Sequence, residues 1–324
     1  MNDFVCVGDA TIDAFLSIHD ANLHCRLNEK DCELCIKYGE KIPVDKFELS
    51  LGGIASNVSV GLSRMGLRSV LCAEIGDDEL SQKIANDLKK ENVKTDLLLK
   101  TRGATASFAV GINFKGERTL FVGHVKRKHD FNLADISTQW VYLGGLGDGW
   151  KAPYRKILDY VQKNNLRLAF TPGSSQLEEL GETVFAVLKK TEVLFVNKEE
   201  AIKILNIKEN YPSKILVQLQ RISPKIVVIT DGKNGSCAID ENGVMYRLGT
   251  FPAKVVERTG AGDAYASGFL SALIFGRNVS EAMRFGAVNA SSVIEHVGAQ
   301  RGLLGREEVE KRLTDYPEFQ AKEV

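Results

Sequence analysis

The sequence of 324 residues predicts an α/β protein with a central, mostly parallel sheet, helices on both of its faces, and a small additional β-sheet. Three observations lead to this prediction. Short apolar runs rich in Val, Ile and Phe alternate with amphipathic segments of helical period. Glycine-containing loops follow several of these runs, where an open α/β sheet binds its ligands. Two β-rich stretches, approximately 14–50 and 103–123, interrupt the alternation. We therefore expect a single domain over residues 1–324, with these two stretches inserted as a small β lid.

The expected elements follow this alternation along the chain. In the first half, we expect strands at 4–7, 69–75 and 140–143, and helices at 54–65 and 78–91. Residues 104–122 alternate in polarity and predict a hairpin that turns at Lys115-Gly116-Glu117. In the second half, strands are expected at 166–171, 193–196, 225–230 and 236–239. The matching helices are expected at 154–163, 177–189, from 197 onward, and at 261–275, 280–296 and 307–313.

Composition narrows the class of protein. The 42 basic and 42 acidic residues cancel, so bulk charge gives no reason to expect a nucleic-acid partner. No apolar run has the length of a transmembrane helix, so no membrane partner is expected. The first residues start like a strand and lack a basic region followed by an apolar signal core. We therefore expect a cytoplasmic protein.

The most informative stretch is Thr259-Gly260-Ala261-Gly262-Asp263, which precedes a long apolar helix. Glycines let another group approach the backbone, and the first N–H groups of a helix have no partners within it. These N–H groups and the helix dipole attract an anion, and Asp263 lies beside them. Phosphoryl transfer requires this combination, with a base for the attacking hydroxyl and donors for the moving phosphate. The alternative is a glycine turn and a helix-terminal acid.

Two polar residues of the first half are candidates for ligand binding. Asp13 follows the first strand, where a side chain can face a ligand, although a turn or cap role would also explain it. Gly52-Gly53 opens a helix that has Asn57 in its first turn, where the amide can reach a hydroxylated ligand. The alternative for this segment is a glycine turn followed by a buried polar helix residue.

Two patterns of the second half each have two interpretations. Asn197 and Glu200, three residues apart at the start of a helix, can hold a hydrated Mg²⁺ or form a capping box. Taken alone, the capping box is the better explanation. Gly232 and Gly235 after Thr230 can bring backbone and hydroxyl groups to phosphates, or can simply form a hairpin turn.

A cysteine cluster lies in the first inserted stretch. Cys25-x6-Cys32-x2-Cys35, with His19 and His24 nearby, has the residue types of a zinc site. There is one Cys-x2-Cys and no second pair, so we favour a small β excursion that covers a site. The sequence has no G-x4-G-K-[ST], which excludes a P-loop nucleotide enzyme.

Taken together, these motifs resemble the ribokinase-like (PfkB) family of sugar and nucleoside kinases. The resemblance extends over nearly the whole chain because several motifs occur in the family's order. They are Gly52-Gly53-x3-Asn57, Asn197-x2-Glu200, Thr230-x-Gly232-x2-Gly235, Thr259-Gly260-Ala261-Gly262-Asp263 and Val297-Gly298-Ala299. The fourth motif is the most specific of the set.

The resemblance implies a ribokinase-like fold whose β lid often forms a dimer contact, and it implies ATP and Mg²⁺ as cofactors. It implies that Asp263 removes a proton from a sugar hydroxyl while N–H groups around Gly260, Ala261 and Gly262 hold the charge on the γ-phosphate. The remaining implied roles are sugar binding by Asp13, Gly52, Gly53 and Asn57, Mg²⁺ positioning by Asn197 and Glu200, and nucleotide binding by Thr230, Gly232, Gly235 and Asn289.

Three departures from the family pattern affect what we expect. The family usually has Asp-Thr where this chain has Glu257-Arg258, and that Asp helps many members bind a monovalent cation, so K⁺ activation is in question. Arg258 is positioned either to approach a phosphate or to face solvent. Ribokinases proper have a substrate-contacting acid where this chain has Gly144-Gly145-Leu146-Gly147, so ribose specificity does not follow. The cysteine-rich segment is no part of the family pattern.

The resulting prediction is an ATP-dependent sugar kinase, a homodimer through its lid, that acts on a small-molecule sugar. Two alternatives remain: a nucleoside kinase on the same fold, and a catalytically silent sugar- or nucleotide-binding regulator. The sugar and the hydroxyl that is phosphorylated depend on pocket contacts that sequence spacing does not place.

Overall fold

The computed structural model describes the whole chain except residues 20–21, 26–31, 115–116, 134–135 and 209. It describes no side chain within 20–32 or 115–118. Ten strands form the main sheet in the order β16-β15-β14-β13-β12-β11-β10-β1-β6-β7. The strands that pair in parallel are β1 (Asn2–Val7), β6 (Ser69–Ile75), β7 (Lys94–Lys100), β10 (Thr138–Leu143), β11 (Arg167–Phe170), β12 (Val193–Asn197) and β13 (Ile226–Thr230). The antiparallel strands β14 (Ser236–Ile239), β15 (Met245–Leu248) and β16 (Lys322–Glu323) extend one edge.

Helices cover both faces of this sheet because successive strand residues point to opposite sides. In β1, Phe4 and Cys6 belong to one buried apolar cluster, whereas Val5 and Val7 belong to another. The first cluster includes residues of α1 (Ile54–Arg64), α2 (Glu79–Lys90), α8 (Ala261–Ile274), α9 (Val279–Val293) and α10 (Arg306–Asp315). The second includes residues of α3 (Lys151–Lys163), α4 (Ser174–Glu178), α5 (Glu182–Leu188), α6 (Lys198–Leu205) and α7 (Pro212–Gln220). The predicted fold class is therefore confirmed.

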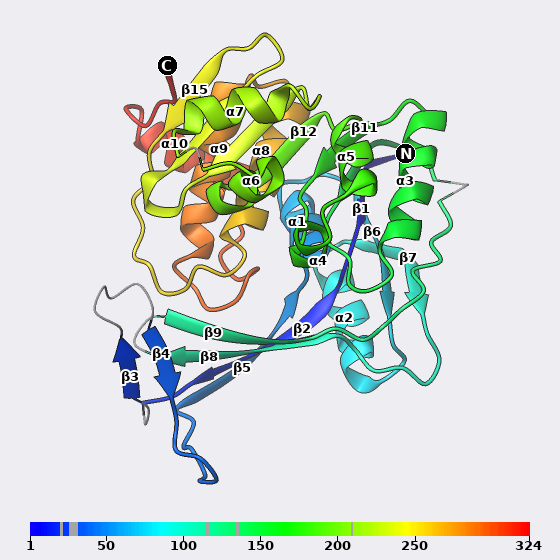
Figure 1. Ribbon diagram of the computed structural model, residues 1–324, viewed down its shortest axis with the longest axis vertical. Coiled ribbons are helices and arrows are strands. Elements are labelled where there is room, and N and C mark those ends of the chain that lie inside the picture. The colour runs from blue at the N-terminus through cyan, green and yellow to red at the C-terminus, as the bar shows by residue number, and fades with distance from the viewer. Residues whose placement is uncertain (20–21, 26–31, 115–116, 134–135, 209) are drawn as a thin grey trace.

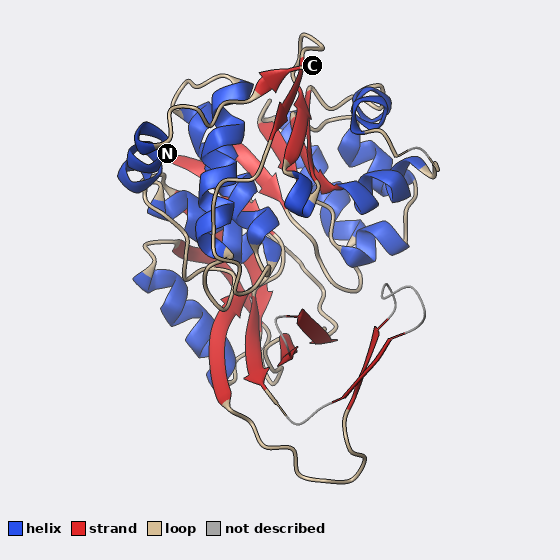
Figure 2. Ribbon diagram, turned by 90° about the vertical axis from the view of Figure 1, so that its left-hand side faces the viewer, coloured by secondary structure: helices blue, strands red, loops and turns tan. Residues whose placement is uncertain are grey.

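A smaller sheet forms the lid and projects from the edge of the main body (Figures 1 and 2). Its four strands, in the order β5-β2-β8-β9, are β5 (Lys46–Gly52), β2 (Thr11–Ser17), β8 (Phe108–Phe114) and β9 (Glu117–Gly123). They come from the two stretches that interrupt the strand–helix alternation. A separate hairpin, β3 (Asn22–Cys25) with β4 (Cys32–Cys35), lies beyond the end of the lid sheet.

The two faces of the lid sheet differ in polarity. On one face, Asp13 is paired in register with Ser50, and Glu48 forms an ion pair with Arg301 of the main body. The other face is apolar and largely open to solvent: Phe47 is 59% exposed and Phe121 is 57% exposed. The lid therefore directs polar groups to one side and leaves an apolar surface on the other.

The predicted helix over 177–189 is wrong as a single element. Two helices, α4 and α5, replace it, because the backbone at Gly181 is extended and Gly181 caps α5. Sequence reasoning also missed α7 and the strands β7, β15 and β16. In the described part of the chain, no helix is long and apolar enough to cross a membrane.

Candidate active site

The start of α8 occupies the centre of the candidate site. Its residues from Ala264 to Ala272 are all buried, and the helix packs against α9 and α1, which fixes its N-terminal end in place. Gly260 is the N-cap with a φ of 74°, and a Cβ there would lie 2.4 Å from the Cβ of Ala299. A side chain at Gly260 would therefore be both strained and overcrowded. The Ala261 N–H makes only a long contact of 3.4 Å to the Arg258 carbonyl oxygen, so the first turn retains donors for a ligand.

Asp263 lies in this first turn and accepts a hydrogen bond of 2.7 Å from Asn57 Nδ2. The pKa of Asp263 is raised to about 7, chiefly by burial and to a lesser extent by the negative charges of Glu200 and Asp13, whereas the Asn57 hydrogen bond lowers it. A carboxylate with a pKa near neutrality is suited to accept a proton from a hydroxyl group. The structure therefore places a carboxylate with a raised pKa at the start of α8.

The predicted sugar-binding residues surround this carboxylate. Asp13, on β2, is buried and accepts a hydrogen bond of 3.0 Å from Thr11 Oγ1. A Cβ at Gly52 would lie 2.3 Å from the Asp13 carboxylate, and one at Gly53, whose φ is 92°, would lie 2.3 Å from a backbone oxygen. Both glycines are therefore required because the chain between β5 and α1 passes close to Asp13 of β2 and to the backbone just before β2.

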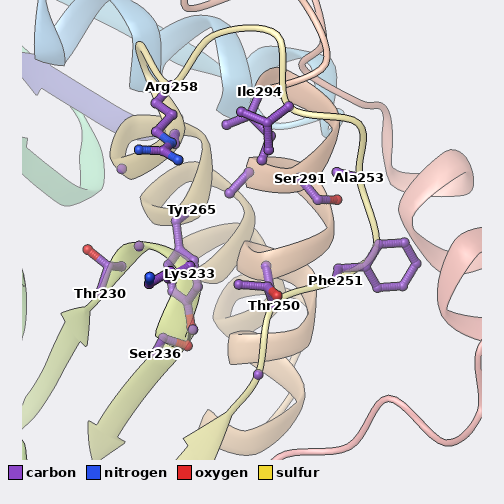
Figure 3. Close-up of a pocket in the computed structure, with 18 of the residues that line it drawn as sticks. Thr230, Lys233, Ser236, Thr250, Phe251, Ala253, Arg258, Tyr265, Ser291 and Ile294 are labelled. Atoms are coloured by element: carbon purple, nitrogen blue, oxygen red, sulfur yellow. Dashed lines mark hydrogen bonds between the residues drawn. The ribbon is translucent and has the colours of Figure 1, made fainter. Parts of the chain in front are cut away.

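A cavity of about 520 Å³ opens beside the first turn of α8 (Figure 3). The predicted nucleotide residues Thr230, Gly232 and Gly235 line it, and so do Ala261 and Gly262. Two cationic side chains, Arg258 and Lys233, also line the cavity. The apolar part of the wall includes Phe251 and Val255 of the loop before α8, and Ala290 and Ile294 at the end of α9. Cations near a helix N-terminus suit phosphates, and the apolar wall suits a base.

Asn289, which the family resemblance places in the nucleotide site, does not line this cavity. Its side chain is fully buried in α9, where Nδ2 donates to the Ala264 carbonyl oxygen at 2.8 Å and Oδ1 accepts from the Leu304 N–H at 2.9 Å. Asn289 therefore connects α8 to the segment after α9, and its role in nucleotide binding stays a prediction. Its neighbours Ala290 and Ser291 face the cavity instead.

Asn197 and Glu200 form a reciprocal capping box at the start of α6. Asn197 Oδ1 accepts from the Glu200 N–H at 2.8 Å, and Glu200 Oε2 accepts from the Asn197 N–H at 2.9 Å. Burial raises the pKa of Glu200, and its charge acts on Asp263. The capping interpretation is therefore confirmed. It leaves the second carboxylate oxygen of Glu200 available, which fits the few protein ligands of a hydrated Mg²⁺.

The departure at Glu257-Arg258 has a structural explanation. The buried Glu257 carboxylate accepts hydrogen bonds from the Thr259 hydroxyl and, at 3.0 Å, from the Gly298 N–H. It thus joins the loop before α8 to the loop after α9. Arg258 is exposed and lines the cavity (Figure 3), so it faces both the cavity and solvent, and its approach to a phosphate stays a prediction.

Sequence reasoning missed two groups at the site. The first is Gln300, whose Nε2 donates to Asn57 Oδ1 at 2.9 Å. The second is Asp9, immediately after β1, whose carboxylate lies 3.9 Å from His124 Nδ1. Burial raises the pKa of Asp9 to about 6, against the charges of His124 and Arg127. β1 lies between β10 and β6, so Asp9 is at the point where the strand order reverses. The position of Asp9 directly after a strand is the sequence signal that could have identified it.

The zinc hypothesis stays a prediction. The side chains of His24, Cys25 and Cys32 lie outside the described residues, although β3 and β4 pair the backbones of these two cysteines. Cys35 is a free thiol, and His19 bonds to Asp45 through Nδ1 at 2.6 Å. Across the described side chains, no group of three or more metal-ligating residues is present.

Comparison with known proteins identifies the family of the chain and several relatives. The pfkB family carbohydrate kinase model matches residues 3–304. 5-dehydro-2-deoxygluconokinase 2 of Bacillus cereus is 28% identical over 284 residues, which cover 81% of this chain and 85% of that protein. The nucleoside kinase of Methanocaldococcus jannaschii superposes with a TM-score of 0.78 at 24% identity, over 97% of this chain and 99% of that one. The ribokinase of Thermotoga maritima also gives a TM-score of 0.78, at 21% identity, over 97% and 100% of the two chains.

The relatives named as sugar kinases, together with a carboxylate beside a helix N-terminus, indicate a phosphotransferase whose acceptor is a hydroxyl group. The family match then makes the identification definite. The chain belongs to the PfkB family of carbohydrate kinases, and its fold is ribokinase-like.

Proposed function

We propose that this protein transfers the γ-phosphate of ATP to a hydroxyl of a small sugar, with Asp263 as the general base. The observation that carries the proposal is the position of Asp263 in the first turn of α8, where it follows Gly262 of the cavity wall and accepts a hydrogen bond from Asn57 of α1. In this reaction the bond between the γ-phosphorus and the bridging oxygen breaks, and a bond from the sugar oxygen to phosphorus forms. Asp263 takes the hydroxyl proton, and ADP leaves.

The same arrangement supports the other proposed roles. The Gly260–Gly262 backbone would hold the charge on the transferred phosphate, as an oxyanion hole does. Asp13, Gly52, Gly53 and Asn57 would bind the sugar, and Thr230, Gly232 and Gly235 would bind the nucleotide. Asn197 and Glu200 would position Mg²⁺, which when bound neutralises phosphate charge. The lid would exclude water, which otherwise competes as the acceptor. We treat residues 1–324 as one domain in which 14–50 and 103–123 form this lid.

The acceptor that we propose is a sugar or a sugar acid. The Bacillus cereus relative is named for a ketogluconate-type sugar acid, and the Asp9–His124 pair offers both a hydrogen-bond acceptor and a donor to a polar substrate. Nucleosides are the competing acceptors, and a binding protein without turnover is the alternative of another class. The experiment below separates these three.

Release of ADP from Mg-ATP would be measured over ribose, fructose, 5-dehydro-2-deoxygluconate, 2-keto-3-deoxygluconate, fructose 6-phosphate and a set of nucleosides. We expect turnover with one sugar or sugar acid, because the site combines a base with an anion-binding backbone. Each assay is run in K⁺ and in Na⁺ to test for activation by a monovalent cation. Glu257 stands where many family members have an Asp that helps to bind such a cation, and its carboxylate already accepts a hydrogen bond from the Gly298 N–H. Turnover confined to nucleosides would contradict the sugar assignment, and binding of ATP without turnover on any acceptor would indicate a regulator.

We also propose that the protein is a homodimer through the apolar face of the lid, formed by Phe47, Leu49, Phe108 and Phe121, and that it works in the cytoplasm. These side chains are 37–59% exposed, and joining two such faces would bury them. The free, buried thiols of Cys6 and Cys72 fit a reducing compartment.

Replacing Phe121 by Glu should convert the dimer to a monomer, because a charge would then be buried in the apolar contact. Light scattering coupled to size-exclusion chromatography measures the mass of the protein in solution. The matched control is Tyr211→Glu, which replaces another exposed aromatic residue, at the N-cap of α7 and outside the lid. A wild-type protein that is monomeric at all concentrations, or a Phe121→Glu variant that stays dimeric, would refute the lid contact.

A further inference from the structure

A chain of two side-chain hydrogen bonds leads to the candidate base. Gln300 Nε2 donates to Asn57 Oδ1 at 2.9 Å, and Asn57 Nδ2 donates to Asp263 Oδ2 at 2.7 Å. The amide of Asn57 has one accepting end and one donating end. Because Gln300 occupies the accepting end, the donating end points to the Asp263 carboxylate.

The segment that contains Gln300 is fixed from two sides. Arg64, at the end of α1, donates through Nη1 to the carbonyl oxygens of Gln300 at 2.8 Å and Leu303 at 2.9 Å. The same guanidinium forms two parallel bonds of 2.8 Å with Glu91. On the other side, Glu257 accepts from the Gly298 N–H at 3.0 Å. Gln300 is itself only 8% exposed, so its side chain is held in one direction.

We propose that Gln300 is a positioning residue for catalysis. Gln300 sets the orientation of the Asn57 amide, so that Asn57 donates a hydrogen bond to Asp263 and does not accept one from it. This inference rests on the proposed role of Asp263 as the base. Gln300 does not contact Asp263 in this structure; it acts through Asn57.

The surroundings of Asp263 make this orientation important. The ionisable groups that act on it are Glu200 of α6 and Asp13 of β2. Burial and, after it, the charge of Asp263 raise the pKa of Tyr142 of β10. Two negative charges and burial all favour the protonated carboxyl, which is not a base. Among the described side chains, Asn57 supplies the hydrogen bond that favours the ionised form. A reversed amide would present an oxygen to Asp263 and would favour the protonated carboxyl instead.

The substitution Gln300→Glu tests this directly, because Glu has almost the same shape but only accepts hydrogen bonds when ionised. It would accept from Asn57 Nδ2 and reverse the amide. We expect the acid limb of the kcat/KM profile to move to higher pH by about one unit. With a wild-type pKa of about 7, this corresponds to a loss of about fivefold at pH 7 and of about tenfold well below pH 7. The loss should shrink as the pH rises towards 9. A merely structural defect would lower activity by the same factor at every pH.

Two further variants complete the experiment. Gln300→Met removes the donor without adding a charge, so it should shift the acid limb in the same direction by less than Gln300→Glu does. It also serves as the test if Gln300→Glu does not fold, as judged by circular dichroism. The matched control is Gln82→Glu on the exposed face of α2, which should leave the profile unchanged.

Unchanged acid limbs in both Gln300 variants, or a pH-independent loss, would overturn the positioning role. Failure of this inference is separable from failure of the proposed function. If Asp263→Asn abolishes turnover while the Gln300 variants keep the wild-type profile, only the orientation of Asn57 by Gln300 is refuted. If Asp263→Asn retains full turnover, the base assignment itself falls.

Discussion

Replacing Asp263 by Asn is expected to lower kcat by about 10²–10⁴-fold, because Asn cannot accept the proton of the attacking hydroxyl. ATP binding should persist, since the cavity is lined by other residues. In the wild-type enzyme the base must be ionised, and burial raises its pKa to about 7, so kcat/KM should fall as the pH drops below about 7. Steady-state kinetics from pH 5.5 to 9 with the acceptor found above measures both effects.

Thermal unfolding provides the control for this variant. The folded-state pKa of Asp263 is raised above the ordinary value of 3.8, so ionisation of this group costs stability as the pH rises from about 4 through about 7. Asn removes that cost, and the Tm of the variant at pH 8 should equal or exceed that of the wild type. Loss of activity together with a lower Tm would point to misfolding, and undiminished turnover would exclude Asp263 as the base.

The second large effect is expected at Gly262, where Val should reduce turnover by about 10²-fold or more with little change in Tm. A Cβ at this position meets no atom within 4 Å, so the folded chain has room for it. Gly262 nevertheless lines the cavity at the first turn of α8, and a branched side chain would occupy the space that a phosphate needs. Initial rates at saturating sugar over a range of ATP concentrations measure the effect.

The matched control is Gly181→Val at the start of α5. The φ of Gly181 is 179°, which any residue adopts, and a Cβ there would have its nearest neighbour at 3.8 Å. This variant should keep normal turnover because α5 contributes no residue to the cavity. Normal ATP turnover in Gly262→Val would show that the phosphate does not approach this backbone, and the anion-hole proposal would fail.

Local sequence was sufficient for most of the fold. The strand predicted at 69–75 is β6, and the helix predicted at 78–91 is α2 with Asp78 as its cap. Such elements are predictable because hydrophobic period and capping residues act over a few positions. Where the local signal was ambiguous, as at Gly181, the prediction merged two helices into one. The strands β15 and β16 are short and lie at the sheet edge, so their sequence carries little period to detect.

The sequence by itself therefore determined the α/β class, the inserted lid and the residues of the motif around Asp263. Only the tertiary structure decided which distant side chains meet there. Asn57 and Gln300 are 243 positions apart, and Asn57 and Asp263 are 206 apart. It also decided that Asn289 holds α8 to the segment after α9, and that Glu257 joins two loops. Such contacts depend on how helices pack on the sheet, and packing brings together residues whose spacing in the chain carries no periodic signal.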